Sequence, residues 1–183
     1  SELEEIIERI KRLIEEDRET VKEVLERLRR LSDEDRKEVK RVLREIKELI
    51  KELEDLRRRI KDEETLRRLL EDIRRRLEEL VRRLEEKNRR SHEEHKKLAE
   101  ELRKKNDDSM RKIERLVEKA VEDAGRPLEE LERLKEEAKR VIKRTRDELE
   151  KILRENRELI DRSRKELRDL EKELRDVVRE SER

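Results

Sequence analysis

The sequence predicts an all-α protein, an antiparallel helical bundle of the coiled-coil type. Of its 183 residues, 62% are charged and none is aromatic, and there is only one Gly and one Pro. A composition dominated by Glu, Lys, Arg and Leu is typical of long helices. Nearly every Leu, Ile and Val also falls on a heptad stripe, with spacings that alternate between three and four residues. This periodicity favours helices packed along narrow apolar seams over a disordered chain.

Three interruptions of the stripe divide the chain into four expected helices. Ser32 begins the run Ser-Asp-Glu-Asp and is expected to cap the second helix, while Asp62 is expected to cap the third. Gly125 suits a left-handed C-cap, and Pro127 suits the first turn of a new helix. The expected bundle therefore has two short helices of about 30 residues and two long ones of about 55–60, over 2–31, 34–61, 63–124 and 127–181.

Short connections make consecutive helices antiparallel neighbours. On this reading the two short helices cover only one end of the long pair. Residues 1–92 with 158–183 are expected to form a closed four-helix end, and residues 93–157 a protruding helical hairpin.

Polar residues interrupt the stripes of the two long helices in a matched way. In an antiparallel hairpin that turns near Gly125, the residue numbers of facing positions add to 251. Three polar pairs meet that sum: Asn88 with Ser163, His95 with Asn156, and Asn106 with Thr145. Ser91 and Ser109 face Ile160 and Ile142 instead. Polar core residues fix helix register because a slipped pairing leaves them unsatisfied. The predicted hydrogen-bonding positions are Asn88, Ser91, His95, Asn106, Ser109, Thr145, Asn156 and Ser163.

The protruding hairpin would leave its apolar stripe uncovered, and a long apolar strip marks an interaction surface. A second copy of the chain is the simplest cover, which predicts a two-fold symmetric homodimer. The alternative is one half of a heterodimer or a binding module, completed by a helical partner chain. A third possibility is a closed monomer whose short helices straddle the middle of the long pair. The predicted interface residues are Leu98, Leu102, Met110, Ile113, Val117, Val121, Leu131, Leu134, Val141, Ile142, Leu149 and Leu153.

Several function classes are disfavoured. The net charge is +1 and the charges alternate in sign, so no basic face is available for nucleic acid. Uncharged runs are too short for a membrane span or a signal peptide, and a soluble protein of unknown compartment is expected.

No catalytic or metal site is expected either. His92 and His95 are three residues apart, but there is no further histidine, and zinc needs three or four converging ligands. His95 is better interpreted as a core residue and His92 as a solvated one. Asp17 is interpreted as a boundary residue paired with an arginine. We therefore expect no enzymatic activity, no cofactor and no small-molecule substrate.

The chain resembles computationally designed helical bundles with buried hydrogen-bond networks. The resemblance covers all 183 residues. It rests on the Glu/Lys/Arg surface, the connectors Ser-Asp-Glu-Asp and Ala-Gly-Arg-Pro, the aromatic-free core and the Asn/Ser/Thr/His layers. It implies a designed structural protein whose purpose is self-assembly and which has no natural biochemical function.

Overall fold

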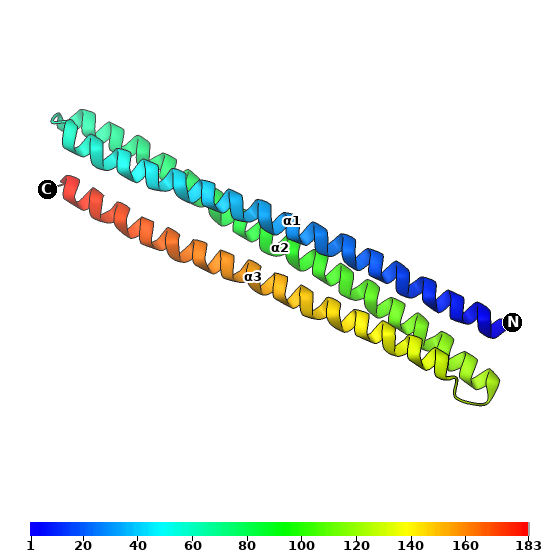
Figure 1. Cartoon of the computed structure of the whole chain (residues 1–183). Helices are drawn as coiled ribbons and strands as arrows, with labels where there is room; N and C mark the ends of the chain where they lie inside the picture. Colours follow the sequence, from blue (N-terminus) through cyan, green and yellow to red (C-terminus); the bar gives the residue numbers. More distant parts are fainter. Residues whose placement is uncertain (183) are drawn as a thin grey trace. The chain divides into compact units, whose positions relative to one another are not determined.

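The computed structural model describes residues 1–182 and shows three long α-helices (Figure 1). Helix α1 spans Glu2–Arg59, α2 spans Glu63–Ala124 and α3 spans Glu129–Glu182. The all-helical class is confirmed. Helices α2 and α3 correspond to the two long helices expected over 63–124 and 127–181.

The prediction of four helices with two short ones is wrong, because α1 continues through the expected break at Ser32. The Ser-Asp-Glu-Asp run contains neither Gly nor Pro, and its residues cost a helix interior only about 0.5 kcal/mol each. Asp35, expected in the first turn of a new helix, instead faces inward and is buried. Since residues 2–59 form one helix, the predicted closed four-helix end of 1–92 with 158–183 does not form.

Two other local signals behave as expected. Asp62 precedes α2, accepts a side-chain hydrogen bond from Thr65 at 2.5 Å, and also accepts backbone hydrogen bonds from Glu64 and Thr65. These bonds hold the pKa of the Asp62 carboxyl below its ordinary value. Gly125 ends α2 with a φ of 65°, and its N–H donates to the carbonyl of Val121 at 2.9 Å. The predicted cap and the predicted left-handed turn are confirmed.

The chain divides into two units, each built from three helical segments. The first unit contains Ser1–Arg30 and Glu94–Arg154, and the second contains Leu31–Glu93 and the chain from Glu155 onward. The first unit has two apolar clusters, one containing Ile10, Ile113 and Leu131 and the other Leu28, Leu102 and Leu149. The second unit has one continuous cluster, whose buried members are Val39, Val42, Leu43, Ile46, Ile50, Leu53, Ile73, Leu77, Leu80, Leu84, Leu167, Leu170 and Val177.

The spacing of buried positions along α2 differs from a strict heptad. One set of buried residues recurs every 11 residues, at Ile73, Leu84, His95, Asn106 and Val117. Eleven residues over three turns give about 3.67 residues per turn, which lies close to the 3.6 of a straight α-helix. The spacing of these buried positions therefore matches the period of a straight α-helix more closely than a heptad repeat does.

Candidate functional site: polar contacts in the helical core

All eight polar positions predicted to lie in the core are buried. None is more than 8% exposed, and His95 is completely covered. Among the described residues, no buried side-chain nitrogen or oxygen lacks a hydrogen-bond partner. A polar group left unpaired in an apolar core costs about 1–3 kcal/mol. The hydrogen bonds of these buried groups therefore avoid that cost.

The largest polar cluster lies in the second unit and joins all three helices. Asn156 on α3 donates from Nδ2 to Oγ of Ser91 on α2 at 3.0 Å. The Ser91 hydroxyl donates in turn to the carboxylate of Asp35 on α1. Nζ of Lys87 lies 3.2 Å from the other carboxylate oxygen of Asp35. We call Asp35, Lys87, Ser91 and Asn156 the three-helix polar cluster.

The buried carboxylate of Asp35 is balanced by the ammonium group of Lys87, which is closer to the surface. The side chain of Asp35 is 3% exposed, whereas that of Lys87 is 39% exposed. The ammonium group therefore stays in contact with water while it balances the carboxylate, as long lysine side chains commonly do. Asp35 has one neutral donor and one charged donor, which is the condition under which a buried carboxylate is tolerated.

A second polar contact in the same unit joins α2 to α3. Asn88 Nδ2 donates to Ser163 Oγ at 2.9 Å, and the Ser163 hydroxyl donates to the carbonyl of Ile160 at 2.9 Å. Asn88 and Ser163 form one of the pairs whose residue numbers add to 251. The Ser163 hydroxyl therefore serves both as an acceptor for the amide and as a donor to the backbone.

The first unit holds a corresponding contact between α1 and α2. Ser109 Oγ donates to Asp17 at 2.6 Å. The prediction that Asp17 pairs with an arginine is therefore wrong. Burial raises the pKa of the Asp17 carboxyl above its ordinary value, the hydrogen bond from Ser109 opposes that rise, and the neighbouring charge of Glu16 adds to it. Burial of the carboxylate here thus outweighs the hydrogen bond that supports it.

Thr145 departs from its expected pairing. Its hydroxyl donates to the carbonyl of Val141, four residues earlier in α3, at 2.9 Å. Both Asn106 and Thr145 belong to the described residues and both are buried, but no hydrogen bond joins their side chains. Threonine commonly satisfies its hydroxyl in this way inside a helix, because the carbonyl of the preceding turn is always within reach.

Sequence reasoning missed Asp35, and two signals could have found it. Asp35 follows Leu28 by seven residues and precedes Val39 by four, so it continues the inward stripe if α1 is not broken. The residue numbers of Asp35 with Ser91, and of Asp17 with Ser109, both add to 126. A search for pairs of polar residues in α1 and α2 whose numbers add to one constant would have paired both aspartates with their serines. The sequence analysis placed Ser91 and Ser109 opposite isoleucines of α3 instead.

The predicted oligomer interface is covered from within the chain. Residues 1–30 pack on the hairpin of 94–154 in the first unit, so the premise of an uncovered hairpin is wrong. Among described residues, Leu3 is the single large apolar side chain classed as exposed, at 38%. The interface residues that are buried are Leu102, Ile113, Val117, Leu131, Leu134, Ile142 and Leu149. Those that are partly buried are Leu98, Met110, Val121, Val141 and Leu153.

Ion pairs between α1 and α3 follow one rule in both units. In the first unit Arg18 lies 2.7 Å from Glu137, and Arg29 lies 3.3 Å from Glu148. In the second unit Lys47 lies 2.7 Å from Glu166. In these three pairs α1 supplies the cation and α3 the anion, at a separation of 119 residues. A fourth pair, Arg57 with Glu180, has the same polarity and is separated by 123 residues, about one helical turn more. A constant separation is the mark of a parallel helix pair, and these pairs supplement the apolar register of α1 on α3.

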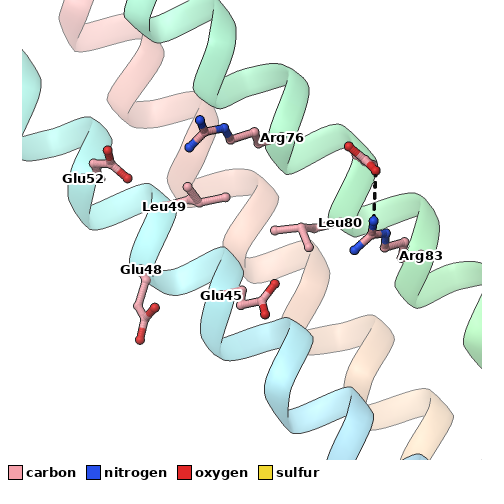
Figure 2. A pocket seen from close by; sticks show the side chains of 8 residues that line it. Glu45, Glu48, Leu49, Glu52, Arg76, Leu80 and Arg83 are labelled. Atoms are coloured by element: carbon pink, nitrogen blue, oxygen red, sulfur yellow. Dashed lines mark hydrogen bonds and ion pairs between the residues drawn. The ribbon is translucent and has the colours of Figure 1, made fainter.

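A shallow groove between α1 and α2 in the second unit shows how the outer surface is charged (Figure 2). Its volume is about 320 Å³, and Leu49 and Leu80 line it. Glu45 and Glu52 stand on the α1 side, whereas Arg83 on α2 turns to Glu79 of its own helix at 3.2 Å. The apolar side chains of the lining are limited to these two leucines, and the other lining residues are charged, so the groove lacks the mostly apolar side chains that line a ligand pocket.

The described residues show no candidate for metal binding or for membrane crossing. They contain no group of three or more His, Cys, Asp or Glu side chains placed to share an ion. None of the three helices has a segment that is both long and apolar enough to cross a bilayer.

Comparisons with known proteins agree with the fold. No family model matches the chain, and no curated protein sequence does. A solved structure described as "Computationally designed three helix bundle" is similar, with a TM-score of 0.65 and 17% sequence identity. The match covers 99% of this chain and 93% of that one. The expected resemblance to computationally designed helical bundles is therefore confirmed at the level of fold, and that protein shares the three-helix architecture.

Proposed function

We propose that this chain is a designed structural protein, a helical-bundle scaffold with no natural biochemical function, in which buried polar contacts select the pairing of the helices. The observation that carries the proposal is the three-helix polar cluster. Its side chains come from α1, α2 and α3, and each of its contacts joins two different helices. The fold similarity to a designed three-helix bundle supports the designed origin and favours the absence of enzymatic activity.

The physical basis is the difference between stability and specificity. An apolar stripe of Leu, Ile and Val tolerates a slip of one helix along another, because most apolar contacts are remade. A slip of α3 by one turn would leave the amide of Asn156 without its acceptor in the core and would take from the Ser91 hydroxyl the donor on α3. Such a state loses about 1–3 kcal/mol for each unpaired group, so the polar cluster penalises wrong registers.

The test replaces the cluster by apolar residues. In D35L/S91A/N156L we expect an unchanged or higher melting temperature, because buried polar sets exchanged for apolar groups are often neutral or stabilising. The same variant should lose its single conformation and show several sets of backbone amide resonances or several oligomeric masses. The matched control, L43I/L84I/L167I, changes one buried leucine per helix in the same unit and should keep one conformation. A triple variant as uniform as this control would contradict the proposal.

The oligomeric state belongs to the same proposal. The homodimer through the hairpin of 93–157, or the heterodimer with a designed partner chain, stays a prediction. Because residues 1–30 cover that hairpin, either assembly requires this segment to leave its place. Light scattering across a range of concentrations distinguishes a monomer from a dimer.

A further inference from the structure

The N-terminal segment of α1, residues 1–30, contacts the hairpin of 94–154 through two separate apolar patches. Ile7, Ile10 and Ile14 belong to one cluster of the first unit, and Leu25 and Leu28 to the other. Between the two patches, Asp17 and Thr20 turn toward the core and are only partly buried. The segment therefore lies on the hairpin as an amphipathic helix with a polar interruption at its centre.

All polar contacts of this segment with the hairpin join residues that are far apart in the sequence. Asp17 and Ser109 are separated by 92 residues, whereas Arg18–Glu137 and Arg29–Glu148 are each separated by 119. The segment joins residues 31–182 after Arg30. The connection raises the effective concentration of the segment at the hairpin but supplies none of these contacts. The same segment of a second copy can make all of them.

The junction that follows the segment still carries a helix-start signal. Ser32, Asp33 and Glu34 are residues favoured at a helix cap and first turn. Just beyond them, Asp35 is held in the second unit by Ser91 and Lys87. If residues 1–30 leave the hairpin, a helix that begins at Ser32 keeps its own cap and its own anchor. A break of α1 at this position is therefore less costly than a break elsewhere in the helix.

From these observations we infer that residues 1–30 are an exchangeable helix and that the hairpin of 94–154 is a helix-binding surface occupied by the chain's own segment. Its other occupant is the same segment of a second copy. Two chains that exchange segments form a symmetric dimer with no new type of contact, which is the low-cost route to a dimer known as domain swapping. The inference gives a hairpin-mediated homodimer a physical route and makes residues 1–30 its recognition element.

Charge reversal provides a sharp test, since the two ion pairs join the segment to α3. In R18E/R29E the segment carries glutamates that face Glu137 and Glu148, and in E137K/E148K the hairpin carries lysines that face Arg18 and Arg29. Each variant alone has only like charges at these positions. In an exchanged dimer of the two variants, all four positions become complementary.

The two full-length variants, one of them isotope-labelled, are mixed, heated through unfolding, cooled and analysed by native mass spectrometry. We expect the mixed dimer to be about ten-fold more abundant than the dimer of either variant alone, because several exposed ion pairs of modest strength change sign together. The combined variant R18E/R29E/E137K/E148K restores complementarity within one chain. It should be monomeric in the same assay and melt near the temperature of the original chain.

A matched control uses the ion pair of the second unit. K47E mixed with E166K reverses one ion pair of the same kind in residues 31–59 of α1, which lie between residues 1–30 and α2, and should give no mixed dimer. If R18E/R29E and E137K/E148K remain monomeric together while the combined variant melts normally, the segment does not exchange and the inference fails. A mixed dimer in the control pair would also overturn it, because exchange would not be confined to residues 1–30.

Discussion

Ser91 is the position at which a small change should have the largest effect on the polar core. Replacement by alanine removes one oxygen and keeps Cβ, so the packing volume changes little. That oxygen accepts from the Asn156 amide at 3.0 Å and donates to the Asp35 carboxylate. In S91A both partners lose this contact, and both are nearly inaccessible to water, at 3% and 2% exposure.

The expected loss follows from the two groups that are left unpaired. A buried donor or acceptor without its partner costs about 1–3 kcal/mol, and charged groups lie at the upper end of that range. Lys87 remains beside Asp35 and limits the loss there. The free energy of unfolding should therefore fall by roughly 2–5 kcal/mol, which far exceeds the usual effect of a Ser-to-Ala exchange at a surface position.

Urea unfolding followed by circular dichroism measures this loss, with an unchanged denaturant slope as evidence that the two variants unfold in the same way. The same S91A substitution is then made in a D35L/N156L background, where the Asp35 carboxylate and the Asn156 amide are both absent. There it should be nearly neutral, and the difference between the two backgrounds gives the coupling energy. A loss below about 0.5 kcal/mol in the original chain, or an equal loss in both backgrounds, would refute the reasoning.

Three further predictions concern other parts of the molecule. Because the pKa of the Asp17 carboxyl is raised in the folded state, folding favours its protonated form. Stability should therefore fall as the pH rises from the ordinary carboxyl range through the raised pKa, and D17N should abolish this step in unfolding curves measured across pH while keeping the acceptor for Ser109. G125A should lower the free energy of unfolding by about 1–2 kcal/mol, because alanine is strained at a positive φ, and G125N should lose less, as calorimetry can show. L102A should destabilise the chain by about 2–5 kcal/mol at every protein concentration, since Leu102 is fully buried within the chain. A melting temperature of L102A that depends on concentration would instead place this residue in an interface between copies.

Local sequence features were sufficient to predict the all-helical class and the bounds of α2. The charged, aromatic-free composition and the apolar periodicity led to long packed helices, and Gly125 marked the turn because only glycine is unstrained in the left-handed conformation found there. Asp62 marked the start of α2 because its carboxylate reaches the free backbone N–H groups of the first turn. The inward polar positions could be found because burial follows the helix period wherever the helix is continuous.

The tertiary structure decided whether α1 is one helix or two. A helix cap contributes about 1 kcal/mol, so the signal at Ser32 states a local preference that packing can override. Burial of an apolar side chain such as Ile10 or Leu28 contributes about 1.5–3 kcal/mol. Five residues of the N-terminal segment are buried on the hairpin of 94–154: Ile7, Ile10, Ile14, Leu25 and Leu28. Their combined burial outweighs the cap, which is why the sequence predicted an uncovered hairpin and the structure shows a covered one.

The hydrogen-bond partners of Ser91 and Ser109 were also not predicted from the sequence, because they depend on how α1 packs. Ser91 and Ser109 had been placed opposite isoleucines of α3, because α1 was assumed to lie elsewhere. With α1 continuous, Asp35 and Asp17 reach these serines from a third helix. The sequence by itself determined which side chains turn inward, since that follows from one helix and its period. Only the packing of three helices decided which of those side chains meet, because a contact depends on the position of every helix that surrounds it.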